Sequence, residues 1–330
     1  MQGNMTRYFL MFDELCPFIY FIDEKRIVAK LYVFYIFHRF KMRRSTLSQL
    51  FMEICFFGLF CSVTLNADES LFENSFNHFS GNSLKKVTVI GERCSGTNYI
   101  SGLIKSNFPL YKTRSDEYAQ KHFYPWLDLP AFSISKKGKR ERDVNFLNNS
   151  KECLFIVVVR DPYNWLRSFY AQPFHVLSRK MIGKGFFHFL QHEWRAEESK
   201  HNNVSYPDHW NPYKERPFKN VLELRKYKIL NYLQVGILVD NFFVVQYEKV
   251  AKNPAQFVEF MSENFHMEKN DVFENITSYK NEGKKKFQKK EYPPFEIKEF
   301  EFINQEIDWD VEKFIGYSKV ESLDDVNSKR

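Results

Sequence analysis

The stretch Val87-Thr-Val-Ile-Gly-Glu-Arg-Cys-Ser-Gly-Thr-Asn-Tyr99 carries the clearest information about the fold. Its first four residues are all β-branched and predict a short strand that ends at Gly91. Residues 97–108 follow with apolar side chains at helical spacing. A loop between a strand and a helix points backbone N–H groups and a helix N-terminus at one place, which suits a phosphate or a sulfate. The alternative is an ordinary strand–turn–helix unit without a ligand.

The spacing of Gly91 and Gly96 equals that of the glycines in the Walker A loop. That loop continues with Lys and then Ser or Thr, which bind the β- and γ-phosphates and Mg²⁺. Thr97 and Asn98 occupy these two positions here. We therefore expect a loop that binds an anion but lacks the groups that handle a Mg-nucleotide triphosphate, which argues against an ATPase or a kinase.

A second polar element, Arg160-Asp-Pro-Tyr-Asn-Trp-Leu-Arg-Ser168, follows the apolar run Cys153–Val159. The apolar run predicts a strand that is covered on both faces. Asp161-Pro162 predicts the start of a helix, which places Ser168 about two turns further on. Arg160 is then at the carboxyl end of a strand, where open α/β sheets bind ligands. A guanidinium and a hydroxyl can both donate to a phosphate; the alternative is a surface ion pair and an exposed serine.

Strand-like and helix-like segments alternate from Lys85 onward. Beyond the two elements above, the pattern predicts a strand at 241–247 and helices at 218–235, from Asn253-Pro254, and at about 298–315. This alternation predicts an α/β fold in which a central, mostly parallel sheet is flanked by helices.

The two polar elements together resemble the P-loop sulfotransferase superfamily, and most closely its Golgi carbohydrate and heparan-type members. The resemblance covers about residues 85–318 and implies a P-loop-type three-layer sandwich. It implies that the first loop grips the 5′-phosphosulfate of the donor, 3′-phosphoadenosine 5′-phosphosulfate (PAPS). The candidate donor-binding residues in this loop are Arg93, Cys94, Ser95, Gly96, Thr97 and Asn98.

In the second element, the resemblance implies that Arg160 and Ser168 bind the 3′-phosphate of PAPS. One departure concerns Cys94, because many members have Lys or Arg there, facing the bridging oxygen; Arg93 is a candidate substitute. Gly283-Lys-Lys-Lys286 sits where members carry a basic glycine loop over the nucleotide, so that Gly283 and Lys284 are further candidates. The alternative is a solvated lysine run.

Sulfuryl transfer requires a base that takes the proton of the acceptor hydroxyl, and it requires no metal. The segment 117–124 looks like the one in which heparan-type members carry a Glu before His-Phe-Phe. His122 is the first candidate for the base because the pKa of imidazole lies near neutrality, and Glu117 is the second. Lys121 would neutralise the leaving phosphate in place of the cation missing at Cys94. The alternative is that His122 only packs at the end of a strand.

The acceptor predicted by the resemblance is a hydroxyl-bearing molecule, in the first place a glycan. The polar and aromatic residues between Trp194 and Trp210 could stack on sugar rings, although ordinary loop packing is the preferred interpretation. Two other function classes stay open: a PAP- or PAPS-binding protein with impaired catalysis and, less favoured, a P-loop kinase.

The first 67 residues have a different character. A basic cluster between Arg39 and Arg44 precedes the apolar run 50–65, which only Glu53 interrupts. This layout predicts a signal peptide or a signal anchor at about 42–67, in a leader that spans 1–67; a buried soluble helix is the alternative. The implied location is membrane-anchored or exported, with Golgi type II topology in a eukaryote, or cytoplasmic if the start is misassigned. Residues 68–84 are interpreted as a linker and 319–330 as a polar tail.

The composition limits the remaining possibilities. With 44% hydrophobic and 27% charged residues, the chain of 330 residues is not globally disordered. A net charge of +7 favours anionic ligands, but the pI of 8.9 stays below that of a dedicated nucleic-acid-binding domain. We expect no nucleic-acid partner, and membrane contact only through the N-terminal segment. The five cysteines form no zinc motif, and we expect Cys94 and Cys153 to be free thiols.

Overall fold

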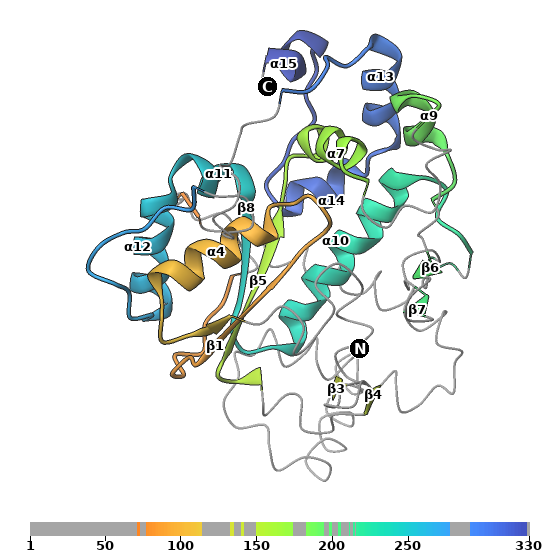
Figure 1. Cartoon of the computed structure of the whole chain (residues 1–330). Coiled ribbons are helices and arrows are strands. Elements are labelled where there is room, and N and C mark those ends of the chain that lie inside the picture. The colour runs from red at the N-terminus through yellow and green to blue at the C-terminus, as the bar shows by residue number, and fades with distance from the viewer. Residues whose placement is uncertain are drawn as a thin grey trace, which may run out of the picture. The chain divides into compact units, whose positions relative to one another are not determined.

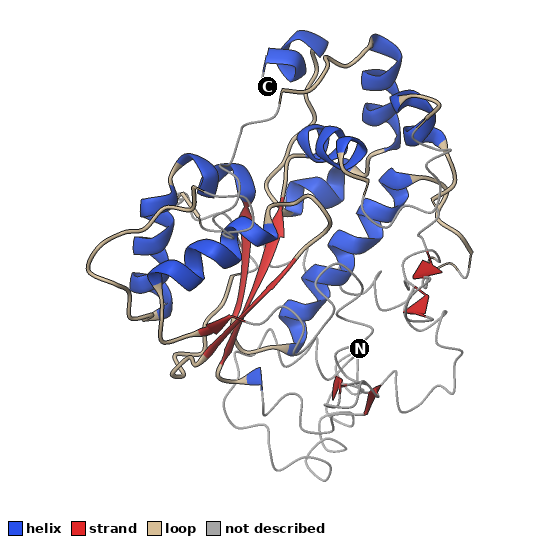
Figure 2. Cartoon of the chain, in the orientation of Figure 1, coloured by secondary structure: helices blue, strands red, loops and turns tan. Residues whose placement is uncertain are grey.

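In a computed structural model, a small parallel β-sheet flanked by helices forms the core of the unit that comprises residues 66–330 (Figure 1, Figure 2). The structure describes residues 71–72, 77–113, 150–173, 183–194, 211, 214, 216–277 and 291–328, and four two-residue strands. These strands form two separate pairs, β3 (Ser133–Ile134) with β4 (Arg140–Glu141) and β6 (Glu198–Ser199) with β7 (Val204–Ser205). The leader predicted at 1–67 lies outside the described residues. Within them, no helix combines the length and the apolarity that crossing a membrane requires.

The central sheet has four strands in the order β2-β1-β5-β8, and all neighbours run parallel. The strands are β1 (Lys86–Ile90), β2 (Lys112–Thr113), β5 (Cys153–Val159) and β8 (Phe242–Gln246). All seven residues of β5 are buried, as expected for a strand that is covered on both faces. The predicted α/β class with a parallel sheet is therefore confirmed.

Helices cover both faces of the sheet (Figure 2). On one face, α4 (Thr97–Asn107) and α12 (Pro254–Phe265) contribute to a core with alternate residues of the strands, such as Val89, Ile156 and Phe243. On the other face lies α10 (Val221–Leu238), whose Gly236 leaves just enough room for the ring of Phe242. The helix α7 (Pro162–Ala171) packs near α10.

Side chains that cap the first turn determine where the helices α7 and α10 begin. The side chain of Asp161 accepts a hydrogen bond from the backbone N–H of Asn164 at 2.9 Å, with Pro162 in the first turn, so that the predicted start of α7 is confirmed. The helix predicted at 218–235 begins at Val221 instead, because the side chain of Asn220 caps two N–H groups of the first turn.

The predicted C-terminal helix at 298–315 is wrong as a single element. The chain forms α13 (Ile297–Glu306) and α14 (Trp309–Phe314), because Asp308 accepts a hydrogen bond from Val311 N and starts a new helix. The remaining helices are α9 (Phe186–Gln191), α11 (Tyr247–Lys252) and α15 (Leu323–Ser328).

The segments interpreted as linker and tail make specific contacts where the structure describes them. His78 pairs with Phe242 as an isolated antiparallel bridge, and Phe72 is buried in the core. In the tail, the side-chain oxygen of Asn327 accepts hydrogen bonds from Arg167 Nη2 at 2.7 Å and from Phe295 N at 2.8 Å. Both segments therefore contribute to the packing of the domain.

We expect Phe243→Ala to lower the free energy of unfolding by about 3–5 kcal/mol, the usual cost of emptying a buried phenylalanine site. Phe243 is fully buried, and its ring lies 5.3 Å from that of Phe265 and 5.4 Å from that of Phe260. Chemical denaturation measures the change. The control is Val272→Ala at a position that is 79% exposed, which should cost less than about 0.5 kcal/mol. Equal costs for the two variants would contradict this description of the core.

Candidate functional site

The carboxyl ends of β1 and β5 form a topological switch point. From β1 the chain passes through α4 to β2 on one side, whereas from β5 it proceeds through α10 to β8 on the other side (Figure 1). Open α/β sheets bind ligands in the crevice at such a point. The two predicted phosphate-binding elements start here, since Gly91 follows β1 and Arg160 follows β5 directly.

The loop 91–96 has an unusual backbone. Cys94 has φ of +60° and Gly96 has φ of +97°, so that the chain makes a tight turn before α4 begins at Thr97. Gly96 is the N-cap residue, and no side chain of the described residues caps this helix. The amino end of α4 thus meets the switch point without a protein carboxylate or hydroxyl as its cap, as an anion site requires.

The two glycines of the loop are needed for close approach. A Cβ atom at Gly91 would lie 2.5 Å from the carbonyl oxygen of Val158, and one at Gly96 would run into the ring of Tyr247. Gly91 therefore lets the loop approach β5, and Gly96 lets Tyr247 cover the start of α4.

The structure brings both elements together. Arg160 Nη1 donates a hydrogen bond to the carbonyl oxygen of Cys94 at 2.9 Å, and Ser168 lies close enough to the Cys94 thiol to lower its pKa. We call this arrangement of loop 91–96, Arg160 and Ser168 the clamp.

One buried hydroxyl in the clamp points to a ligand. Ser95 is 2% exposed, and its Oγ makes no hydrogen bond to any described residue. This atom faces the interior of the loop, since a Cβ atom at Gly91 would lie 2.9 Å from it. Buried polar groups are nearly always hydrogen-bonded, so that an anion oxygen inside the loop is a natural partner.

Arg160 is held by two residues that the sequence analysis did not select. Its guanidinium lies 5.1 Å from the ring centroid of Tyr247, and Nε lies 3.9 Å from Glu248 Oε1. Glu248 also accepts hydrogen bonds from Asp161 N at 3.0 Å and from the Tyr317 hydroxyl at 2.8 Å. Burial raises the pKa of Glu248 above its ordinary value. The sequence signal that could have identified these two residues is their position, because Tyr247-Glu248 directly follows the apolar strand β8.

Arg93 makes its contacts in the base of the loop. It is 1% exposed, its Nη1 lies 3.1 Å from Glu92 Oε1, and its guanidinium lies 5.9 Å from the ring centroid of Trp194. A role opposite the bridging oxygen of the donor would require Arg93 to leave these contacts.

The other predicted site residues divide into two groups. Thr97 is buried in the first position of α4, and the neighbouring Asn98 is exposed. The candidate catalytic residues and the candidate basic loop lie outside the described residues: Glu117, Lys121, His122, Gly283 and Lys284.

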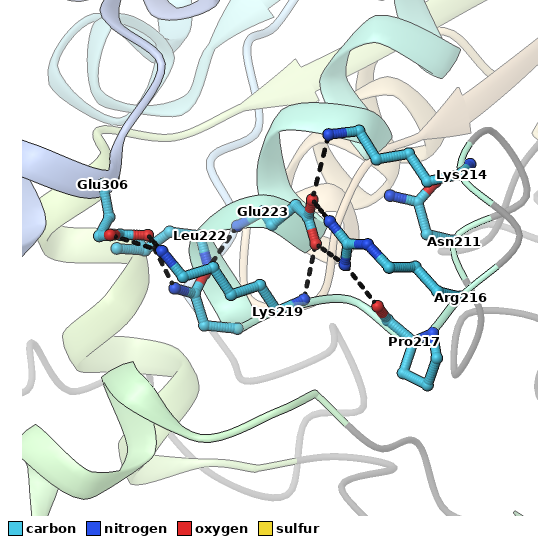
Figure 3. A network of polar contacts seen from close by, with 9 residues as sticks. Asn211, Lys214, Arg216, Pro217, Lys219, Leu222, Glu223 and Glu306 are labelled. Carbon is cyan, nitrogen blue, oxygen red and sulfur yellow. Dashed lines mark hydrogen bonds and ion pairs between the residues drawn. The ribbon is translucent and has the colours of Figure 1, made fainter. Parts of the chain in front are cut away.

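A second polar cluster lies at the start of α10 (Figure 3). Glu223 accepts from Arg216 at 2.7 Å and from the backbone N–H of Lys219 at 2.6 Å, and Lys219 Nζ lies 2.8 Å from Glu306. Burial alone would raise the pKa of Glu223, but the hydrogen bonds from Arg216 and Lys219 lower it. A groove of about 440 Å³ lies beside Lys219 and Glu306, and its lining contains no residue of the clamp. We interpret this cluster as structural, because its charges pair with one another.

A scan against protein-family models finds no match, and neither does a search among curated proteins or among solved structures.

We expect Gly96→Ala to destabilise the protein more than Gly81→Ala does. Both glycines have positive φ, +97° and +77°, and a side chain there costs about 1–2 kcal/mol. Only at Gly96 does the new methyl group meet another residue, the ring of Tyr247, whereas Gly81 has no atom within 4 Å of such a methyl group. Thermal unfolding of both variants measures the difference. Equal shifts in Tm would contradict the contact between Gly96 and Tyr247.

We expect the thiol of Cys94 to react slowly with iodoacetamide. Burial raises its pKa from 9.0 to about 11, although Arg160 and the hydrogen bond from Ser168 oppose this. Since the thiolate fraction at a fixed pH falls about tenfold for each unit by which the pKa rises, alkylation at pH 8 should be about 100-fold slower than in an unstructured peptide. Peptide mapping of time points separates Cys94 from the other cysteines. The control is the same reaction in denaturant, and an equal rate in the folded protein would contradict the shift.

Proposed function

We propose that this protein is a sulfotransferase that moves a sulfuryl group from PAPS to a hydroxyl-bearing acceptor. The observation that carries the proposal is the clamp, in which Arg160 Nη1 donates a hydrogen bond to the Cys94 carbonyl at 2.9 Å and Ser168 lies near the Cys94 thiol. Two sequence elements that resemble the 5′- and 3′-phosphate sites of one superfamily thus lie within reach of one nucleotide. The parallel sheet with helices on both faces is compatible with the P-loop-type three-layer sandwich that the resemblance implies.

The proposed ligand fits the donor groups of the clamp. Ser95 Oγ has no hydrogen-bond partner among the described residues, and none of their side chains caps the start of α4, so that both suit a terminal phosphosulfate; the guanidinium of Arg160 suits a phosphate monoester. During the reaction a base takes the proton of the acceptor hydroxyl. The acceptor oxygen forms a bond to sulfur while the bond from sulfur to the phosphate oxygen breaks, and 3′,5′-adenosine bisphosphate (PAP) leaves with that electron pair. Fixed N–H and O–H donors of the loop would stabilise the charge that builds up on this oxygen.

A PAP- or PAPS-binding protein with impaired catalysis is the second candidate. Cys94 favours it, because a thiol with a pKa of about 11 is neutral at pH 7 and cannot neutralise the leaving phosphate as a Lys or an Arg would. Transfer of ³⁵S from labelled PAPS to a panel of glycans separates the two candidates. Labelled product supports the enzyme, whereas tight PAP binding without product on any acceptor supports the binding protein.

A P-loop kinase is disfavoured by the start of α4. Thr97 and Asn98 stand where a Walker A loop has the Lys and the Ser or Thr that bind phosphates and Mg²⁺. A kinase would bind ATP with Mg²⁺ more tightly than it binds PAP, and calorimetry with both ligands measures this directly.

We expect Arg160→Ala to weaken PAP binding by about 10- to 150-fold, because a lost hydrogen bond to a charged group costs about 1.5–3 kcal/mol. Isothermal titration of the full chain measures the affinity. The matched control is Arg216→Ala, since Arg216 pairs with Glu223 at the start of α10 and should not affect the nucleotide (Figure 3). Unchanged affinity in Arg160→Ala, or absence of PAP binding by the unaltered protein, would refute the proposed site.

A further inference from the structure

We propose that two buried cations on one face of α10, Arg225 and Lys228, are positioning residues for the two halves of the clamp. This inference rests on the proposed function and assigns a role to residues outside the clamp. Arg225 is 4% exposed and Lys228 is 0% exposed, and they stand three positions apart, which places them on the same side of the helix.

Arg225 holds the residue from which the guanidinium of Arg160 projects. Its Nη2 donates a hydrogen bond to the carbonyl oxygen of Arg160 at 2.8 Å. Arg225 itself is fixed by Glu312, through a bond from Nε at 2.6 Å and one from Nη2 at 2.8 Å. Burial disfavours its charged form, but Glu312 outweighs burial and raises the pKa of Arg225 above its ordinary value. A planar guanidinium can make these bonds together, whereas a lysine cannot reproduce the geometry.

The guanidinium of Arg225 also contacts a tryptophan, Trp165, that binds the loop. It lies 4.9 Å from the ring centroid of Trp165, which is fully buried. The indole Nε1 of Trp165 donates a hydrogen bond to the carbonyl oxygen of Arg93 at 2.8 Å. A backbone carbonyl in each half of the clamp is therefore bound by a buried donor group.

Lys228 holds the base of the loop. Its Nζ lies 3.0 Å from Glu92 Oε2, and Glu92 Oε1 accepts a hydrogen bond from the backbone N–H of Arg93 at 2.6 Å. Glu92 is 6% exposed, so that its position is fixed by these buried contacts. Lys228 thus positions the loop, which is the half of the clamp proposed for the 5′-phosphate. Arg225 mainly positions Arg160, which is the half proposed for the 3′-phosphate.

The division of roles can be tested with two ligands that differ by one phosphate. PAP carries the 5′- and the 3′-phosphate, and 5′-AMP carries only the first, so that the ratio of their affinities reports on the 3′-phosphate alone. We expect Arg225→Lys, which keeps the charge beside Glu312, to weaken PAP about tenfold and to leave 5′-AMP within about twofold. A general loss of structure would weaken both ligands and would not change the ratio.

The matched experiment removes the ion pair on the loop side. In the variant Lys228→Met, Glu92 loses this lysine but keeps the guanidinium of Arg93, whose Nη1 lies 3.1 Å from Glu92 Oε1, so that no remaining charge of the cluster loses its last partner. We expect PAP and 5′-AMP to weaken by the same factor, about tenfold, with their ratio unchanged. Lys228→Gln, which keeps a polar group of similar length beside Glu92 but removes the positive charge, should also weaken both ligands alike and serves if Lys228→Met does not fold.

Titration calorimetry of the full chain, with thermal unfolding of each variant as a check on folding, decides between the outcomes. A lower ratio in Arg225→Lys combined with an unchanged ratio and weaker binding in the loop-side variants supports the inference. An unchanged ratio in Arg225→Lys, or unchanged affinities in the loop-side variants, overturns it and leaves the proposed function intact. If the unaltered protein binds no PAP, the proposed function fails and this inference fails with it.

Discussion

The parallel pairing of β1 with β5 is the constraint on which the site depends. In this register Ile90 lies opposite Val157, so that the residues directly after both strands emerge at the same edge of the sheet. A register shift of one residue would turn alternate side chains to the opposite face and would place polar groups such as Thr88 in the core below α4. The core that fixes this register therefore also fixes the distance between loop 91–96 and Arg160.

Burying the charged groups below the clamp costs free energy, and ion pairs between them offset part of this cost. Arg225, Lys228, Glu92 and Glu312 are each at most 6% exposed. Isolated charges of this kind would destabilise the fold by several kcal/mol, and loss of one partner of a buried pair costs about 3–5 kcal/mol. Each of these four charges lies within 3.0 Å of an opposite charge. Such pairs add little stability compared with apolar side chains, but they accept and donate in fixed directions, which a site for a charged ligand needs.

The sequence was sufficient to predict the elements that depend on local patterns. The β-branched run 87–90, the apolar run 153–159 and the Asp161-Pro162 helix start all fall where the structure has them. The sequence was not sufficient where a single polar residue determines where a helix ends and the next begins. Asp308 is such a residue, because it divides the predicted C-terminal helix in two. The contacts of Arg160 with Tyr247, Glu248 and Arg225 could not be predicted either. They join segments that lie far apart in the sequence, and a local pattern of apolar residues does not show which segments pack together. The proposed catalytic residues from 117 to 122 and the basic loop at 283 remain predictions.

The contact between Asn327 and Arg167 has a consequence for biosynthesis. Arg167 precedes Ser168 in α7, and its partner Asn327 lies 160 residues later in the chain. On the ribosome, at about 5–20 residues per second, roughly 10–30 seconds separate the synthesis of these two residues. Until then α7 lacks this hydrogen bond, so that a chain truncated before Asn327 would keep the residues of the central sheet but lose one contact that holds the helix of Ser168.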